Sequence, residues 1–320
     1  MSDQIKTKKY TSGDKFLKDI SYGGEMYQNL KDFFIFRGHQ SGSYKLIPSV
    51  LRHKLTMKDA AGNTVEDDKD APFDLANSEF IQKNIEYIEL RKFFNVCDKN
   101  SLRLPPVDKI RQALYSQQDI IQSFLNEGEW LPYDLQELAA LAQHYGMETR
   151  LLDWTTNIET AIYFAVHKEP DLTKEDLSSD DSNYVAIWAL NQAAFSIMDT
   201  PLKIIRPPYH GNPNLAAQRG LFTFWKVSGL HIPFGGGGTH GKEMEVFKRL
   251  TNRTPLDELI AGECEKQGRK DVIMWKLLIP RKDRKVLYEY IRNKGVSAAS
   301  LFPGYEGAVR SIKEDKSFNL

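Results

Sequence analysis

Four short, mostly apolar runs constrain the fold of this 320-residue chain more than any other feature of its sequence. They are residues 34–36, 151–153, 184–190 and 272–279, and each is bounded by turn-forming or polar residues. Short apolar runs of this kind predict buried strands. We therefore expect an α+β fold whose core sheet is mixed or antiparallel.

The stretch between the first two runs has a different period. In residues 78–96 large apolar side chains recur at helical spacing, and residues 108–125 repeat the pattern. A third periodic segment, residues 134–145, stops at Gly146, where a glycine can end a helix. The sequence thus predicts an all-helical insertion over residues 78–145.

The rest of the chain is organised around this insertion. We expect one domain over residues 31–310 that contains it, preceded by an N-terminal segment, 1–30, and followed by a C-terminal tail, 311–320. Apolar residues in the N-terminal segment indicate one short helix there. Asn157 is suited to cap a helix that starts directly after the second predicted strand.

The composition of the chain argues against several classes of function. Acidic and basic residues balance at 43 each, so no overall field favours nucleic acid or an anionic membrane. No run approaches the length of a membrane span, and the first residues lack the apolar core of a signal peptide. The two cysteines are too few and too far apart for a zinc motif. We expect a cytoplasmic protein with no membrane partner and no metal site.

Four blocks of the sequence resemble the FRG domain family, which takes its name from the Phe-Arg-Gly found here at residues 36–38. The blocks are residues 36–40 (FRGHQ), 144–155 (HYGMETRLLDWT), 217–223 (AQRGLFT) and 301–307 (LFPGYEG). The second block is the longest and the most specific. The resemblance implies membership of this family, and FRG proteins are often linked to defence against phage.

The order of the blocks also resembles the pattern of ADP-ribosyltransferases. Those enzymes place an arginine or histidine on a first strand, a serine or threonine on a strand that runs into a helix, and a glutamate late in the chain. This resemblance implies a similar fold and catalytic roles for Arg37, Thr155, Gln218 and Glu306, with NAD as the substrate and no firmly implied cofactor. Gln218 stands where a glutamate is wanted, and an amide cannot ionise.

Other polar residues of the same blocks are candidates for binding the ligand. They are His39, Gln40, His144, Arg150 and Asp153. Polar groups among buried neighbours need partners. We therefore expect seven of the candidates to converge on one cleft: Arg37, His39, His144, Arg150, Asp153, Thr155 and Gln218. The alternative interpretation of Arg37 is structural, with Asp153 as its ion-pair partner.

A glycine-rich segment, residues 234–243 (FGGGGTHGKE), is a rival nucleotide motif. Gly236, Gly241 and Lys242 fit a P-loop, but Glu243 replaces the serine or threonine that binds magnesium, and a carboxylate would repel phosphate. The sequence favours a glycine loop around residues 235–238 at the mouth of a pocket, and a loop of this kind can close over a ligand.

Two functional hypotheses stay open. In the first the protein is a mono-ADP-ribosyltransferase-like or NAD-cleaving effector that acts on a protein target in defence against phage. In the second it is a catalytically inactive module that senses a nucleotide or a phage protein through the same cleft. A carboxylate held near Arg37 and Thr155 would favour the enzyme.

Overall fold

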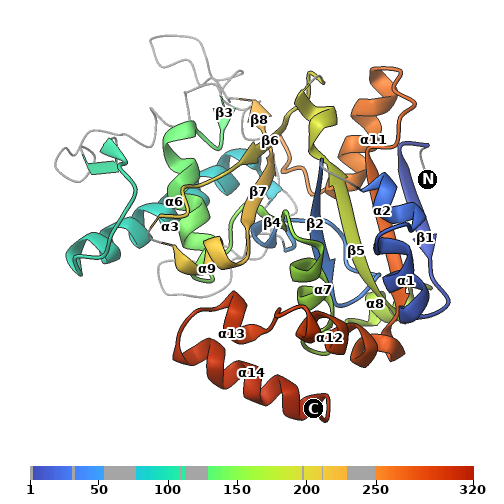
Figure 1. The fold of residues 1–320 in the computed structure, drawn as a ribbon. Helices are drawn as coiled ribbons and strands as arrows, with labels where there is room; N and C mark the ends of the chain where they lie inside the picture. The colour runs from blue at the N-terminus through green and yellow to red at the C-terminus, as the bar shows by residue number, and fades with distance from the viewer. Residues whose placement is uncertain are drawn as a thin grey trace, which may run out of the picture. The chain divides into compact units, whose positions relative to one another are not determined.

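The computed structural model shows two compact units (Figure 1). It describes residues 3–30, 33–53, 77–108, 110–111, 129–196, 198–210, 212–228 and 249–320. Unit 1 consists of Met1–Leu46, Leu152–Thr223 and Pro255–Leu320, and unit 2 of Ile47–Leu151 and Phe224–Thr254. Most of the predicted helix at 108–125 and the glycine-rich segment 234–243 lie outside the described residues.

A seven-stranded sheet forms the centre of unit 1, in the order β1-β9-β5-β2-β4-β7-β6. Its strands are β1 (Ile5–Lys9), β2 (Phe34–His39), β4 (Leu152–Thr155), β5 (Tyr184–Asn191), β6 (Leu202–Ile205), β7 (Gly220–Trp225) and β9 (Met274–Pro280). β1 is parallel to β9, whereas β9, β5, β2, β4 and β7 pair antiparallel in turn, so the sheet is mixed. All four predicted strands are confirmed, and the α+β class with them.

One face of this sheet carries the hydrophobic core of unit 1. Alternate residues of β5 (Val185, Ile187 and Ala189) point to that face, and Leu277 and Ile279 of β9 join them. The helices packed there include α1 (Gly13–Ile20), α7 (Ile158–Val166) and α12 (Arg284–Asn293).

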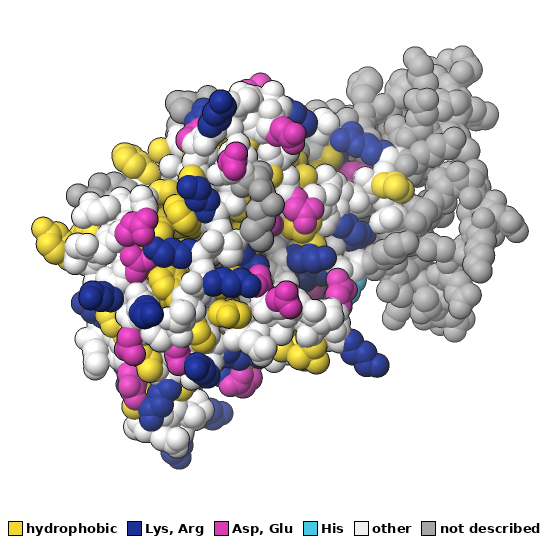
Figure 2. Space-filling model, turned by 90° about the vertical axis from the view of Figure 1, so that its right-hand side faces the viewer, with side chains coloured by type: hydrophobic (Ala, Val, Ile, Leu, Met, Phe, Trp, Pro, Cys, Tyr) yellow, Lys and Arg dark blue, Asp and Glu magenta, His cyan; other side chains and the backbone are white. Residues whose placement is uncertain are grey.

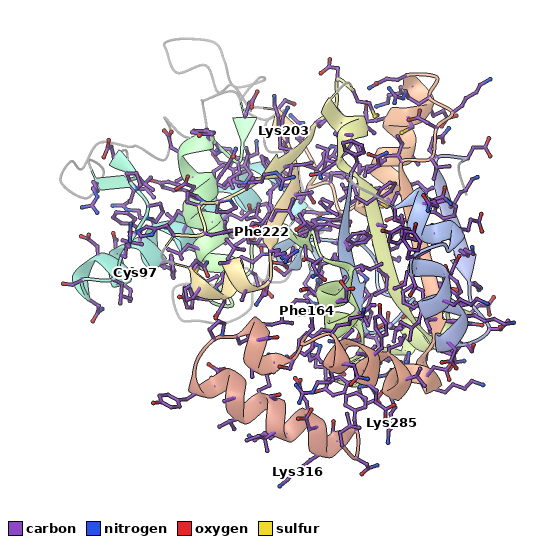
Figure 3. All side chains as sticks on the ribbon, in the orientation of Figure 1. Cys97, Phe164, Lys203, Phe222, Lys285 and Lys316 are labelled. Carbon is purple, nitrogen blue, oxygen red and sulfur yellow. The ribbon has the colours of Figure 1, made fainter. Side chains whose placement is uncertain are left out.

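Helix α7 runs along β2 (Figure 1). A Cβ atom on Gly38 would overlap the carbonyl oxygen of Ala161 in α7, so only glycine permits this close approach. Asn157 caps α7, because its side chain accepts a hydrogen bond from the Thr160 amide at 3.0 Å. Phe164, labelled in Figure 3, packs edge-on against Phe302 with ring centroids 6.3 Å apart.

The ends of the chain belong to the core of unit 1. The segment 1–30 supplies β1 as well as the expected short helix, α1. The segment 311–320, predicted as a tail, continues the last helix, and Phe318 stacks on Tyr288 with ring centroids 4.1 Å apart. The other helices are α2 (Glu25–Asn29), α8 (Lys174–Ser178), η3 (Gln192–Ser196), α9 (Pro213–Ala217), α11 (Leu256–Lys266), η4 (Arg281–Asp283), α13 (Ala298–Leu301) and α14 (Tyr305–Ser317).

Unit 2 is mostly helical in its described part. It contains η1 (Ser49–Leu51), α3 (Glu79–Lys99) and α6 (Tyr133–His144), and the last two confirm predicted helices. The insertion is nevertheless not all-helical, because β3 (Glu129–Trp130) pairs antiparallel with β8 (Val227–Ser228). A two-residue strand is too short to show a period in the sequence. No helix among the described residues is long and apolar enough to cross a membrane.

Candidate functional site

The arginine of the Phe-Arg-Gly motif lies near the end of β2 and is held by three groups. Its Nε donates to His39 Nε2 at 3.0 Å. Its Nη1 donates to the backbone oxygen of Asp153 at 2.7 Å and lies 3.3 Å from the carboxylate Oδ2 of the same residue. The Arg37 side chain is 14% exposed and that of Asp153 is 59% exposed. The predicted ion pair between Arg37 and Asp153 is therefore present, with its carboxylate open to solvent.

His39 links this arginine to the loop that follows β2. Because Nε2 accepts a hydrogen bond from Arg37, the neutral ring carries its proton on Nδ1, which donates to the Tyr44 carbonyl at 3.2 Å. The rings of His39 and Tyr44 meet edge-on at 6.1 Å. Asp153, Arg37, His39 and Tyr44 thus form one continuous chain of contacts, which we call the Arg37 cluster. The neighbouring Gln40 donates to the Phe164 carbonyl of α7 at 3.5 Å.

Thr155 and Gln218 lie together, as the sequence predicts, but through a backbone atom. The Thr155 hydroxyl donates to the Gln218 carbonyl at 2.7 Å and accepts from the Asn157 amide at 3.0 Å. The Gln218 side chain donates instead to the Leu301 carbonyl at 3.2 Å. Glu306 is exposed in the first turn of α14.

The sheet register sets Thr155 apart from Arg37. Phe36 is the register partner of Thr155, and directly opposed residues of antiparallel strands share a face. Arg37 is the next residue along β2 and points to the other face. Strand alternation therefore places Arg37 and Thr155 on opposite sides of the sheet, although the Arg37 guanidinium reaches Asp153, two residues before Thr155.

Arg37 belongs to a row of residues that crosses four neighbouring strands. Thr7 is the register partner of Lys276, Lys276 of Trp188, and Trp188 of Arg37. All of them point away from the core that holds Ile187. The Lys276 ammonium lies 5.4 Å from the Trp188 ring centroid and 2.8 Å from a carboxylate oxygen of Asp181.

Sequence reasoning missed this row, although a signal for it is present. A lysine in the middle of the apolar run 272–279 is unusual, because a buried ammonium needs a partner. Asp181 also pairs with Lys9 at 2.8 Å, so two lysines share one carboxylate.

His144 and Arg150 belong to unit 2, whereas the other predicted site residues belong to unit 1. Arg150 is buried and forms two ion pairs, from Nη2 to Glu79 Oε1 and from Nε to Glu86 Oε2, each at 2.8 Å. The ring of His144 meets that of Tyr145 edge-on at 5.2 Å. The contacts of Arg150 are those of a structural arginine, and the ligand-binding roles of Arg150 and His144 stay predictions.

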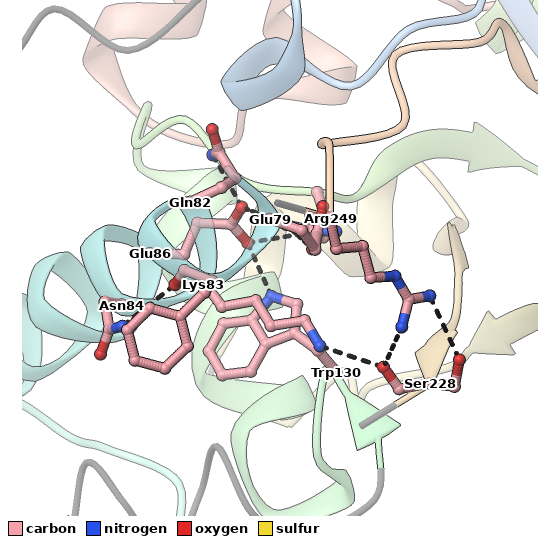
Figure 4. A network of polar contacts seen from close by, with 10 residues as sticks. Glu79, Gln82, Lys83, Asn84, Glu86, Trp130, Ser228 and Arg249 are labelled. Carbon is pink, nitrogen blue, oxygen red and sulfur yellow. Dashed lines mark hydrogen bonds and ion pairs between the residues drawn. The ribbon is translucent and has the colours of Figure 1, made fainter. Parts of the chain in front are cut away.

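Arg150 belongs to a buried polar network in unit 2. Figure 4 shows Glu79, Lys83 and Glu86 of this network on α3. Glu86 also accepts hydrogen bonds from Trp130 Nε1 and from the Gln82 amide, each at 2.8 Å. Burial raises the pKa of Glu79, and burial lowers the pKa of Lys83 to about 8. We call Arg150, Glu79, Glu86 and Lys83 the Arg150 network. Three of its members, Glu79, Lys83 and Glu86, belong to α3. Lys83 and Glu86 follow Glu79 by four and seven positions, which places all three on one helix face.

The described parts of the chain give little support for a metal site or a nucleic-acid surface. No group of histidine, cysteine, aspartate and glutamate side chains there could hold a metal ion. Figure 2 shows lysine and arginine side chains interspersed with aspartate and glutamate on the coloured part of one face. That face does not have the single-sign charge typical of a nucleic-acid surface.

These features define an α+β protein with a polar cluster at the end of a central strand. The family model of the FRG domain matches residues 32–174, a range that begins just before β2 and ends after α7. No curated protein and no solved structure matches the chain. Residues 32–174 of the chain therefore form an FRG domain.

Proposed function

We propose that unit 1 binds a nucleotide, with NAD as the first candidate, on the sheet face that carries Arg37. The observation that carries this proposal is the row from Thr7 through Lys276 and Trp188 to Arg37. It brings a guanidinium, an ammonium and an indole to one face, and these groups recognise phosphates and planar rings. Arg37 pairs with the exposed carboxylate of Asp153, and the phosphate of an incoming ligand can take the place of that carboxylate.

The same geometry supports binding better than transfer chemistry. A transferase of the resembled pattern needs its arginine, its hydroxyl and its late acid around one substrate. Here the Thr155 hydroxyl is taken up by two backbone groups and faces the other side of the sheet. Gln218 turns its amide toward Leu301 and cannot ionise. We therefore favour a nucleotide-binding sensor module, with a phage-derived trigger or a target protein as its partner.

One observation favours the second candidate, an NAD-cleaving or mono-ADP-ribosyltransferase-like effector. The Asp153 carboxylate stands beside Arg37 and is 59% exposed, so an acid does lie next to the arginine. A carboxylate near the nicotinamide ribose would stabilise the oxocarbenium-like transition state of glycosidic cleavage. In this candidate Asp153, rather than Gln218 or Glu306, supplies the negative charge.

Both candidates fit a role in cytoplasmic defence against phage, as the family resemblance suggests. A plaque assay in cells that carry the wild-type gene or its Arg37→Ala variant tests this role. Protection by the wild-type protein alone supports it, and equal plaque counts with and without the gene contradict it.

Titration calorimetry with NAD and ADP-ribose tests binding, and mass spectrometry of free nicotinamide tests cleavage in the same samples. The sensor candidate predicts a saturable isotherm without nicotinamide release. Release that is abolished by Asp153→Asn establishes the enzyme instead. Absence of binding by either ligand at millimolar concentration contradicts the proposed function.

A further inference from the structure

Helix α14 carries a row of exposed apolar side chains along one face. The row consists of Tyr305, Val309 and Ile312, whose exposed fractions are 94%, 51% and 60%. Their spacing of four and three residues places them one above another on one side of the helix, and Lys316 continues the row four positions later. Single exposed apolar residues are normal on protein surfaces, whereas an aligned row of them indicates a surface that a partner covers.

The inward face of α14 is mostly polar, which reverses the usual pattern of a surface helix. In Figure 1 the helix is drawn in red along the lower edge of unit 1, where it packs on α13. Its buried residues are Gly307, Ser311 and Glu314. Glu314 accepts hydrogen bonds from the Tyr163 hydroxyl at 2.8 Å and from Arg310 Nε at 2.9 Å. These contacts attach α14 to unit 1 and leave its apolar row open to solvent.

Two charges of opposite sign border the row on one side. Glu306 and Lys313 are exposed and lie seven positions apart, about two helical turns, so both belong to the same flank of the row. Two copies of α14 that pack antiparallel through their rows bring these matching flanks together. Glu306 of each copy then lies beside Lys313 of the other, and a two-fold axis forms this ion pair twice.

The apolar row fits the same antiparallel arrangement. With the two-fold axis between Val309 and Ile312, Val309 of one copy packs on Ile312 of the other. At each end of the interface Tyr305 meets Lys316 of the other copy, and an ammonium beside a tyrosine ring is a favourable contact. The row and its charged flank are therefore self-complementary, which a symmetric dimer requires.

A parallel pair of the same helices fits less well. It sets the flank that carries Glu306 against the opposite flank, which carries Ala308 and Asp315. Alanine has no charge, and the carboxylate of Asp315 repels that of Glu306 and is already paired with Arg292 at 2.9 Å. The charges of α14 therefore favour the antiparallel arrangement.

We propose that the exposed row of α14 is a dimer interface on which a second copy of this chain packs its own α14 antiparallel. This inference goes beyond the proposed function and is independent of it, because no member of the row from Thr7 to Arg37 belongs to α14. An interface of one helix per copy lies at the low end of specific interface sizes. We therefore expect a weak dimer, with a dissociation constant on the order of 10–100 µM.

Analytical ultracentrifugation of the full chain between about 5 and 500 µM tests the proposal, and we expect the average mass to rise from monomer toward dimer. Ile312→Glu puts a carboxylate into the centre of the interface and should weaken association at least about tenfold. Leu177→Glu in α8 makes the same kind of change at a residue that is 61% exposed. It is the matched control and should leave association unchanged.

Charge reversal tests the antiparallel arrangement without a change to the apolar row. Glu306→Lys sets lysines against each other across the interface, and Lys313→Glu sets glutamates against each other. Each change alone should weaken association about three- to tenfold. A mixture of the two single variants brings opposite charges together at both positions, and we expect it to associate at least as well as the wild-type chain.

Each outcome decides for or against the proposal. A wild-type chain that stays monomeric up to about 500 µM overturns it and assigns the row to a different partner. A dimer that persists in a folded Ile312→Glu variant also overturns it, because the interface then lies elsewhere. If the mixture of charge variants associates no better than each variant alone, the antiparallel interface is wrong. If Ile312→Glu lowers the melting temperature, the charge variants decide, because they leave the apolar row intact.

Discussion

Arg37 and Arg150, two of the three arginines in the family blocks, differ in how deeply their carboxylate partners are buried. In unit 1, Arg37 contacts a carboxylate, Asp153, whose side chain is 59% exposed. In unit 2, Arg150 is 4% exposed and pairs with Glu79 and Glu86, which are 2% and 6% exposed. Water can replace the partner of Arg37 at little cost, whereas it cannot reach the partners of Arg150. Burial of the carboxylate partner, more than the presence of an ion pair, therefore distinguishes Arg37, for which we propose a binding role, from Arg150, whose contacts are structural.

Removal of Arg150 is the change with the largest expected effect. Arg150→Met leaves Glu79 and Glu86 buried without their main cation, so we expect the free energy of unfolding of unit 2 to fall by about 3–5 kcal/mol. Hydrogen–deuterium exchange, which resolves the two units, measures this loss. Addition of Glu86→Gln in the same chain should recover part of it. A loss below about 1 kcal/mol would show that the network is not structural.

The two units should also respond to acid in opposite directions. Burial lowers the pKa of His167 in unit 1 to about 4, so the unfolded state binds the proton first. Stability from this histidine is present above pH 6.5 and is lost as the pH falls toward 4, at a cost of about 3 kcal/mol. The raised pKa of Glu79 acts in reverse, because the folded state of unit 2 takes up that proton first.

Exchange protection measured between pH 7 and pH 4 tests this contrast. We expect protection in unit 1 to fall over this range. His167→Phe should flatten the fall, because a phenyl ring takes up no proton and keeps the stacking on Tyr163. The exposed His53 supplies the control, and His53→Gln should leave the profile unchanged. A profile that is flat in the wild-type protein would contradict a buried neutral His167.

A change at Gly38 should disturb the Arg37 cluster and leave the Arg150 network intact. Gly38→Ala puts a methyl group against the Ala161 backbone, which cannot move as a side chain can, so we expect a loss of about 1–3 kcal/mol confined to unit 1. Exchange of the α7 and α3 amides reports on the two units separately. Equal loss in both helices would contradict the separation of the two clusters.

The sequence predicted the centre of the fold better than its edges. The runs that became β2, β4, β5 and β9 are apolar on both faces or nearly so, and that pattern is readable locally. By contrast, β1 reads IKTKK, with charged residues at most positions, and only its pairing with β9 makes it a strand. Tertiary pairing of this kind leaves no period in the sequence.

One contact of the candidate site was predictable from the sequence, but the arrangement of its residues in the sheet was not. The contact between Arg37 and Asp153 could be anticipated because both stand at strand ends in the family blocks. The face on which Thr155 lies depends on a single register pair with Phe36, and register is not visible in one strand alone. The same is true of Trp188 and Lys276, which become neighbours of Arg37 only through sheet pairing.

The affinity of Arg37→Ala for NAD, measured together with its melting temperature, tests the central claim most directly. We predict that this variant loses at least about tenfold in affinity and stays folded, with a loss of stability of about 1–3 kcal/mol because the buried His39 Nε2 loses its donor. Arg206→Ala, which removes an exposed arginine elsewhere in unit 1, should change neither quantity. Unfolding of Arg37→Ala, or unchanged NAD affinity in a folded variant, would contradict a binding role for the arginine of the Phe-Arg-Gly motif.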